Sequence, residues 1–417
     1  MFRVDMSDDA KPTAKISLPE DFLFGEVPTK PEALAEPRAG VAPAVPVKPI
    51  VPPSLGPLAA FVGTWTGTGF NTIFRPDNSK TPTNLPTPVP AGPPPGTDNV
   101  LELNLTSETL SFSPSLGSVP NRGSDPQGDV FLNGVPYLQV INDVTNPGQK
   151  VGIHVEPGLW MSVPSTDSPA EGPTVFRMGS IPHGTTIQAQ GTSKDIVGPP
   201  TIPPVDITPF TTVAPGNVTT KIEFASQTAT KEGTPRIPQD LTPFIANGTI
   251  TQAILDDPNS ILRNHIATQN IVSTTAIFIS TNPASPLFGG GTDNIAFLLG
   301  ADNDTPLPSR PNAQALQMTA TFWIETVEET ITVPIFNPGD DTLLIEGKSQ
   351  GPGKPVPVFS VTPPVAIPAP RQIKVTSTQI QYSQLVILNF ARLSWPHVSV
   401  ATLVPADPIV VPAAAFN

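Results

Sequence analysis

IHVEPGLWMSVPSTDSPAEGPTVFRMGSIPHGTTIQAQG, residues Ile153–Gly191, is the stretch that decides the fold of this chain. It contains two extended segments joined by a loop rich in proline and serine, and a sharp turn at Pro182–Gly184 leads into a third strand. His154 and Glu156 are two residues apart, so on a strand they share one face at a spacing of about 7 Å. Arg177 lies on the next segment. A sheet built from these strands would therefore present an imidazole, a carboxylate and a guanidinium together.

The composition favours strands over helices. Of the 417 residues, 57 are proline and 31 are glycine, and only 14% are charged. Proline removes a backbone donor and clashes inside a helix, which argues against long helices. Hydrophobic residues still make up 38% of the chain, enough to build a large core. We therefore expect an all-β protein of short strands joined by turns and proline-rich loops.

Charge and targeting signals exclude several classes of function. The net charge is −13 and the sequence has no basic run, so we expect no nucleic-acid partner. The chain has no cysteine, which excludes disulfides, thiolate metal ligands and cysteine nucleophiles. It has neither a run of 18 apolar residues nor the apolar core of a signal peptide. We therefore expect no membrane span and a cytoplasmic location.

Periodicity predicts further elements on both sides of the central stretch. Strands are expected at 100–106, 295–299 and 316–324. Residues 130–141 read as a hairpin that turns at Asn133 and Gly134. The one helix expected covers 257–266, with Pro258 suited to its first turn.

The glycine-flanked tryptophan at the start of the ordered sequence points to a family. Residues 58–69, LAAFVGTWTGTG, resemble the opening of the nitrobindin-like, calycin-type β-barrels, in which a tryptophan, here Trp65, plugs the barrel. The segment 154–158, HVEPG, matches that family's H-x-E-x-G strand and is followed by the aromatic Trp160. The segment 181–191 resembles the two motifs that come next. The resemblance implies an antiparallel calycin-like β-barrel with proline-rich inserts.

The resemblance also implies haem as a cofactor, with one departure. Residues 316–324 resemble the family's closing strand, whose first histidine binds the haem iron, and Gln317 stands at the matching position. Glutamine is a poor iron ligand, so the usual route of haem binding is in question. Iron would need another ligand, for which the chain offers His154, His183 and His265.

Three regions follow from these patterns. Residues 1–57 are a polar leader and an extended proline-rich arm, typical of a linker or of an arm that packs on a second subunit. Residues 58–327 are the barrel domain with its inserts. Residues 328–417 contain additional strands that extend the barrel or pack on it.

The motifs select eight candidate ligand-binding residues: Trp65, His154, Glu156, Trp160, Arg177, His183, His265 and Gln317. His154 with Glu156 reads as a structural hydrogen-bonded pair, or as an imidazole oriented by a carboxylate. His183, in a tight turn, reads as a surface residue or as a ligand-facing residue at the barrel mouth. His265 reads as a core histidine or as an iron ligand, and His397 is assigned no role. The sequence contains no zinc-binding spacing, so no metal site is predicted.

Three classes of function fit this sequence. The first is a β-barrel that binds a hydrophobic small molecule, with haem as the candidate cofactor. The second is an enzyme, either peroxidase-like through haem or an acid–base catalyst through His154 and Glu156. The third is a structural subunit with a filled barrel, whose N-terminal arm would join copies into a homo-oligomer.

Overall fold

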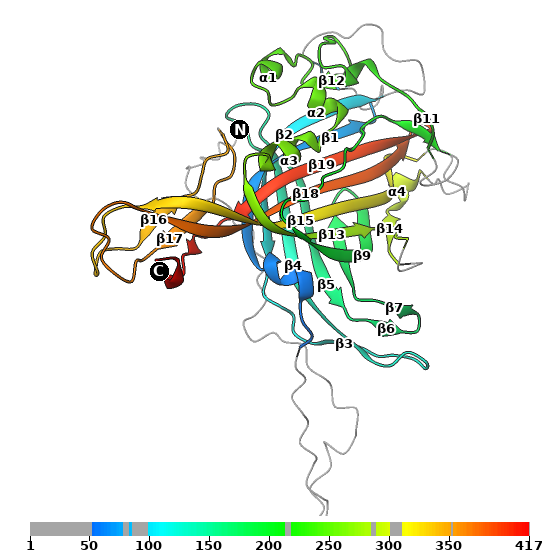
Figure 1. The fold of residues 1–417 in the computed structure, drawn as a ribbon. Coiled ribbons are helices and arrows are strands. Elements are labelled where there is room, and N and C mark those ends of the chain that lie inside the picture. Colours follow the sequence, from blue (N-terminus) through cyan, green and yellow to red (C-terminus); the bar gives the residue numbers. More distant parts are fainter. Residues whose placement is uncertain are drawn as a thin grey trace, which may run out of the picture.

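The fold is a closed antiparallel β-barrel. The computed structural model describes residues 52–77, 83–85, 99–212, 218–284, 289–300, 311–351 and 353–416. In order around the wall, the ten barrel strands are β1 (Gly63–Arg75), β2 (Val100–Phe112), β4 (Val130–Asp143), β5 (Val151–Val163), β8 (Thr174–Ile181), β9 (Thr185–Val197), β13 (Asn270–Ser280), β15 (Gln314–Val333), β18 (Arg371–Phe390) and β19 (Leu393–Pro405). Pairing of β19 with β1, from Trp65 opposite Pro405 to Thr72 opposite Val398, closes the ring (Figure 1). The predicted all-β barrel is confirmed.

Short elements decorate this wall. The minor strands are β3 (Val119–Asn121), β6 (Thr166–Asp167), β7 (Ala170–Glu171), β10 (Phe210–Thr212), β11 (Val218–Lys221), β12 (Arg236–Ile237), β14 (Gly291–Asn294), β16 (Leu343–Glu346), β17 (Val358–Val361) and β20 (Ile409–Val410). The helices are η2 (Gly56–Phe61), η3 (Ala225–Gln227), α1 (Thr242–Ala246), α2 (Gln252–Asp256), α3 (Ser260–Ile266), α4 (Ala296–Leu299) and η4 (Ala413–Phe416). In the part of the chain described here, no helix is long and apolar enough to cross a membrane.

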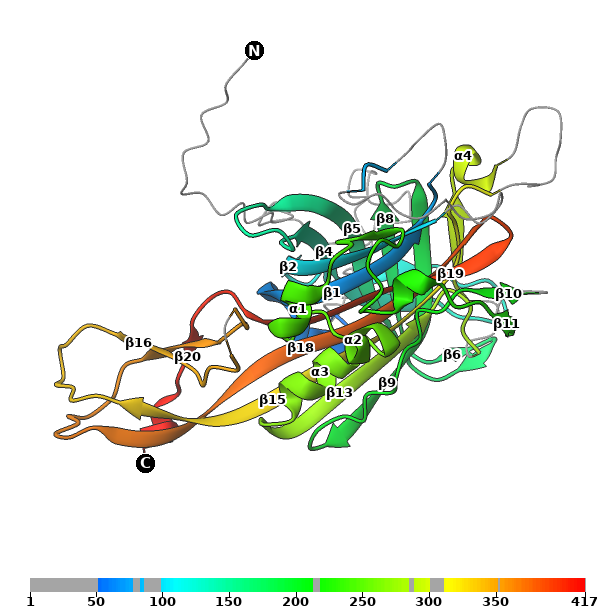
Figure 2. The same ribbon diagram turned by 90° about the horizontal axis from the view of Figure 1, so that it is seen from above.

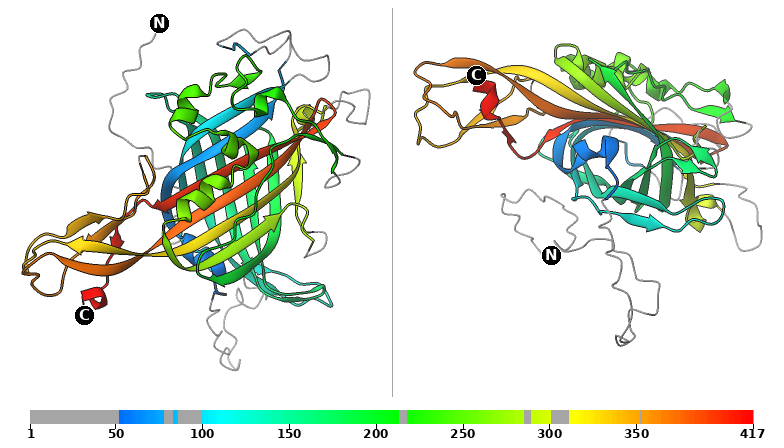
Figure 3. Two further views of the ribbon diagram at one scale, coloured as in Figure 1. Left: turned by 45° about the horizontal axis from the view of Figure 1, so that its top comes forward. Right: turned by 60° about the horizontal axis from the view of Figure 1, so that its bottom comes forward.

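Aromatic side chains seal one end of the barrel. The 3-10 helix η2 lies across that end (Figure 3), and the indole Nε1 of Trp65 donates a hydrogen bond to the carbonyl of Phe61 over 2.7 Å. The ring of Phe61 stacks on Phe112 at 4.7 Å between centroids. Trp160 packs edge-on against Phe61 and Phe322. These rings fill the interior near η2, as the plugging tryptophan of the sequence motif predicts.

Two glycines of the tryptophan motif bring the first and last barrel strands together. A Cβ atom on Gly67 would lie 2.0 Å from the Thr402 carbonyl oxygen, and one on Gly69 would lie 2.2 Å from that of Val400. A side chain at either position would therefore push β1 away from β19.

A layer of short helices covers one outer side of the barrel. Helices α1, α2 and α3 follow one another along this side, and α3 lies against β19 (Figure 2). Leu262 of α3 belongs to the same hydrophobic cluster as Trp323 of β15. The expectation of a single helix at 257–266 was therefore incomplete, although α3 lies inside that range. The strand expected at 295–299 was wrong, because residues 296–299 form the short helix α4. Gly300, with φ 68°, ends this helix.

Two other expectations differ from the structure. The boundary placed at residue 327 falls inside β15. The region 328–417, expected to extend the barrel or to pack on it, contributes two of the ten barrel strands, β18 and β19. Beyond the barrel, β15 and β18 continue as a ribbon toward the small sheet β16–β17–β20, which has its own hydrophobic cluster (Figure 1). No hairpin forms at Asn133 and Gly134, because β4 runs straight through both residues. Of the proposed N-terminal arm, residues 1–57, only residues 52–57 belong to the described part of the chain.

A buried carboxyl group lies between the barrel wall and α3. Glu325 is fully buried on β15 and accepts a hydrogen bond from Gln379 Nε2 over 2.6 Å, and its Oε1 atom has no partner in the described structure. Burial raises the pKa of Glu325 to about 8, an effect that the hydrogen bond from Gln379 only partly offsets.

We expect Glu325→Gln to remove a pH dependence of stability. The pKa of about 8 in the folded protein, against the ordinary value of 4.5, means that between pH 4.5 and pH 8 the folded protein holds a proton that the unfolded chain releases. The contribution of this proton to the free energy of unfolding is therefore complete below pH 4.5. It is lost as the pH rises to 8, a decrease of about 5 kcal/mol in total. Urea unfolding at several pH values should show this decline in the parent protein and a flatter profile in the variant. Parallel profiles would contradict the assignment.

Candidate functional site

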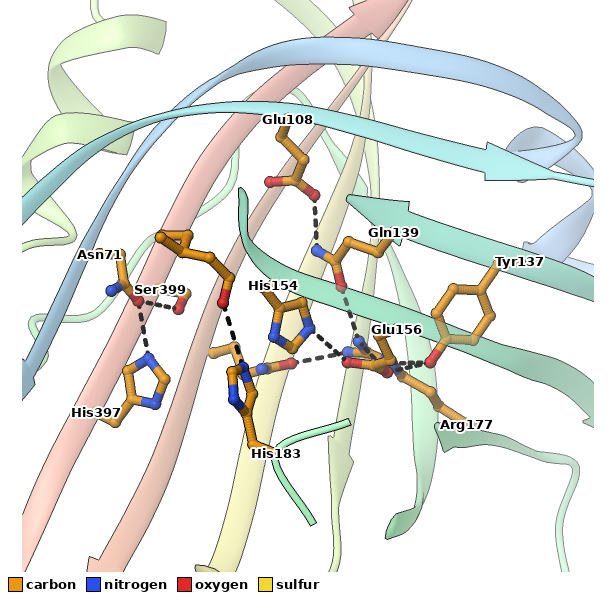
Figure 4. Close-up of polar contacts among 12 residues, drawn as sticks. Asn71, Glu108, Tyr137, Gln139, His154, Glu156, Arg177, His183, His397 and Ser399 are labelled. Carbon is orange, nitrogen blue, oxygen red and sulfur yellow. Dashed lines mark hydrogen bonds and ion pairs between the residues drawn. The ribbon is translucent and has the colours of Figure 1, made fainter. Parts of the chain in front are cut away.

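A cavity of about 640 Å³ occupies the barrel interior on the side away from η2. Its wall comes from nine of the ten barrel strands, all except β13, and from α4. The lining residues on which the site depends are Asn71, Glu102, Asn104, Gln139, Asp143, His154, His183, Tyr382, Gln384, His397 and Ser399, and the apolar ones include Ile73, Ile141, Ile181, Leu298, Val386 and Leu388. Figure 4 shows part of this polar lining, with Asn71, Gln139, the three histidines and Ser399 labelled together with their contacts. A barrel of ten strands therefore leaves room for a guest molecule.

The alternation of side chains along each strand assembles this lining. Residues two apart on a strand point to the same side, so Gln139, Ile141 and Asp143 follow one another up the inner face of β4. On β5, Trp160 belongs to the sealed end, Glu156 is buried, and His154 reaches the cavity. The motif H-x-E therefore spans the border between the filled and the hollow parts of the barrel.

A buried ion pair forms the floor of the cavity. Arg177, 2% exposed, donates from Nη2 to Glu156 Oε1 over 2.7 Å, from Nε to the Tyr137 hydroxyl over 2.9 Å, and from Nη1 to Gln384 Oε1 over 2.8 Å. Nη2 also donates to Gln139 Oε1 over 3.2 Å. The Tyr137 hydroxyl in turn donates to Glu156. All three guanidinium nitrogens are therefore already engaged by the protein.

The ion pair is charged at neutral pH. Burial alone raises the pKa of Glu156, but the Arg177 guanidinium and the His154 ring outweigh it and lower this pKa to about 2. The charge of Glu156 raises the pKa of Arg177 above its ordinary value despite burial. Glu156 can therefore orient His154, but it does not exchange a proton near neutral pH.

A second carboxyl group lies beside this floor. Glu108 accepts hydrogen bonds from Gln139 Nε2 and from the Tyr382 hydroxyl, each over 2.7 Å. Burial raises the pKa of Glu108, and these two hydrogen bonds oppose that rise. Tyr382 and Gln139 thus join two carboxylates into one network under the cavity.

Three histidines share the cavity, and each is held through the same ring nitrogen. His154 Nε2 lies 3.2 Å from Glu156 Oε2, and His183 Nε2 lies 3.2 Å from the carbonyl oxygen of Ile153. His397 Nε2 lies 2.8 Å from Asn71 Oδ1. All three oxygens are acceptors, so Nε2 carries a proton in each ring and donates it to the protein. Nδ1 is then the nitrogen left to meet a ligand.

His397 is neutral over the physiological range. Burial lowers its pKa to about 3, and His154 and His183 contribute further. Its orientation is set by Asn71, whose Oδ1 also accepts from Ser399 Oγ over 2.8 Å and whose Nδ2 donates to Asn104 Oδ1 over 3.0 Å. His397 therefore presents Nδ1 as a hydrogen-bond acceptor.

The structure brings together only part of the predicted set. His154, Glu156, Arg177 and His183 meet at the cavity or its floor. Trp65 and Trp160 do not reach the cavity, because both belong to the aromatic core near η2. His397 was missed, although the alternating segment from His397 to Ser399 and beyond is itself a strand signal.

Two predicted residues lie outside the barrel interior. Gln317 pairs with Ile387, and since Val386 and Leu388 face the cavity, Ile387 and Gln317 face outward. His265 lies on α3, outside the barrel wall, where burial and Lys354 lower its pKa to about 4. Neither residue can serve as a ligand inside the barrel.

The donor set fits haem poorly. Haem carries two propionates, whereas the charged side chains of the described cavity wall are the carboxylates of Glu102 and Asp143. The nearby guanidinium of Arg177 is neutralised by Glu156. No group of three or more histidine or carboxylate side chains in the described structure is placed to hold a metal ion. Haem binding stays a prediction from the sequence resemblance.

Removing one partner of the buried pair should cost more stability than removing both. Arg177→Met leaves the Glu156 charge buried without its cation, which typically costs about 3 to 5 kcal/mol. The double variant Arg177→Met/Glu156→Leu should recover most of that loss. Urea unfolding near neutral pH measures both, with Lys374→Met, which breaks an exposed pair with Glu328, as a control of small effect. A single variant as stable as the control would contradict a buried, charged pair.

No family model and no curated protein matches this chain. A solved structure described as "Crystal Structure of Rv2717c from M. tuberculosis" matches over 86% of this chain and 99% of that chain, at 10% sequence identity and a TM-score of 0.31. A likeness of this size supports no inference about function. The barrel assignment rests on the strand pairing of the chain itself.

Proposed function

We propose that this protein binds a small hydrophobic molecule with a polar end inside its barrel. The observation that carries the proposal is the cavity of about 640 Å³ beside a sealed end. This volume falls within the range of about 300 to 1,000 Å³ that is typical of ligand pockets. The cavity favours a bound guest over the alternative of a solid structural barrel.

The cavity wall changes from polar to apolar along single strands. On β18, Tyr382 and Gln384 belong to the floor network, whereas Val386 and Leu388 continue the wall away from it. Apolar residues from other elements, such as Leu298 of α4, join this outer wall. A ligand with a polar head and a hydrocarbon body matches this order, with the head at the floor.

The enzyme alternative gains less support from the same geometry. His154 and Glu156 do form a pair, but Arg177 and Tyr137 hold Glu156 ionised. An imidazole oriented by a fixed carboxylate is equally suited to hydrogen bonding a ligand. Ligand binding explains the cavity without requiring a group that exchanges a proton, whereas the enzyme alternative requires one.

A cavity-filling substitution tests the proposal. Val386→Trp places an indole in the cavity, whereas Ile387→Trp, one residue along β18, points to the outer face. We expect the first variant to weaken binding of the neutral dye Nile red by about tenfold or more, and the second to leave it unchanged. Fluorescence titration measures both, and haemin titration with an absorbance readout tests the haem prediction in parallel. No dye binding by the parent protein, or equal binding by both variants, would overturn the proposal.

A further inference from the structure

We propose that the polar end of the ligand is a protonated amine. This inference rests on the proposed ligand-binding function and specifies the chemical class of the ligand. It is carried by two independent features of the cavity, the charge of its wall and the hydrogen-bonding direction of its histidines.

The charged groups that face the described cavity are negative. Glu102 and Asp143 line it, and no lysine or arginine does so among the described lining residues. Glu102 pairs with Arg75 at 3.0 Å. Asp143 Oδ1 accepts hydrogen bonds from the backbone N–H and the hydroxyl of Thr145. Asp143 makes no ion pair with a described cation. An organic cation would find a carboxylate there without displacing another cation.

Among the described residues, the floor of the cavity has no free cation that could pair with an acidic head group. Arg177 is the cation nearest to the floor, and its three nitrogens bind Glu156, Tyr137, Gln139 and Gln384. An anionic head group would have to break this network or remain unpaired beside the Glu156 carboxylate and the buried carboxyl group of Glu108. The cavity therefore discriminates against acids by charge.

The histidines of the cavity all use Nε2 toward the protein. An ammonium group carries three N–H donors and no acceptor. His154, His183 and His397 each use Nε2 as a donor toward the protein, which leaves three Nδ1 atoms in one cavity. The rings of His154 and His183 lie 6.1 Å apart between centroids, and Figure 4 shows all three rings at the same side of the floor. The neutral ring of His397 can accept one of these N–H donors through Nδ1.

A matched ligand series tests the inference. Decylamine, decanol and decanoic acid share one hydrocarbon chain and differ in the head group, and each competes with Nile red in a titration near neutral pH. We expect decylamine to bind about tenfold or more tightly than decanoic acid, with decanol between them. Loss of decylamine binding in Val386→Trp shows that the amine occupies the cavity and not the acidic surface.

The outcomes separate the two proposals. Equal binding of the three probes, or tightest binding of the acid, would overturn the amine while leaving the ligand-binding function intact. Failure of the parent protein to bind Nile red and all three probes would overturn the function itself. Amine binding that survives in Val386→Trp would also reject the cavity as the amine site.

Removing the cavity charge provides a second test. The double variant Glu102→Gln/Asp143→Asn keeps an acceptor oxygen for Arg75 and for Thr145 but removes both negative charges from the wall. We expect about tenfold weaker decylamine binding and unchanged decanol binding. The control is Glu346→Gln, at an exposed residue of β16 in the small sheet β16–β17–β20. Unchanged amine affinity, or an equal loss for amine and alcohol, would contradict the inference.

Discussion

The ion pair between Arg177 and Glu156 divides the barrel into a filled half and a hollow half. An isolated ion in such a place would be strongly unfavourable, so each charge requires the other. The pair also recruits Tyr137 of β4 and Gln384 of β18, which lie 40 and 207 residues from Arg177 in the chain. Four strands are therefore joined at one level of the barrel. Below that level the interior is aromatic, and above it the histidines begin.

Space for this pair comes from a residue with no side chain. A Cβ atom on Gly179 would lie 2.2 Å from Glu156 Oε1 and 2.8 Å from the Tyr137 hydroxyl. On the neighbouring strand, a Cβ atom on Gly158 would meet the Tyr137 ring at 2.5 Å. The glycine of the H-x-E-x-G motif thus has a packing role beside its two polar residues. Any larger residue at these positions would displace the groups that hold the charges.

The sequence alone predicted the part of the site that is local. The two-residue spacing of His154 and Glu156 requires one face of one strand, and Arg177 lies on the strand that pairs with it. Tyr137, Glu108, Tyr382 and His397 come from strands whose register depends on closure of the whole barrel, so no local pattern identifies them.

The hairpin predicted at Asn133 and Gly134 was wrong for a reason that depends on packing and cannot be read from the sequence. Asn133 and Gly134 resemble a hairpin turn, but a Cβ atom on Gly134 would lie 2.3 Å from the Trp160 carbonyl oxygen, so the glycine serves close strand packing. The Asn133 side chain is likewise used within the fold, accepting from Ser115 over 2.6 Å. A glycine needed for space and one needed for a turn look the same in a sequence.

Residues along the inner face of β5 contribute in turn to the sealed core, the ion pair and the cavity. Steps of two residues place Trp160 in the sealed core, Glu156 in the ion pair and His154 in the cavity. The same carboxylate neutralises Arg177 and fixes the donor nitrogen of His154. The direction of the imidazole is therefore a consequence of the ion pair beneath it. A guest in this cavity meets the remaining ring nitrogen of His154, while the guanidinium of Arg177 is already occupied by Glu156 beneath it.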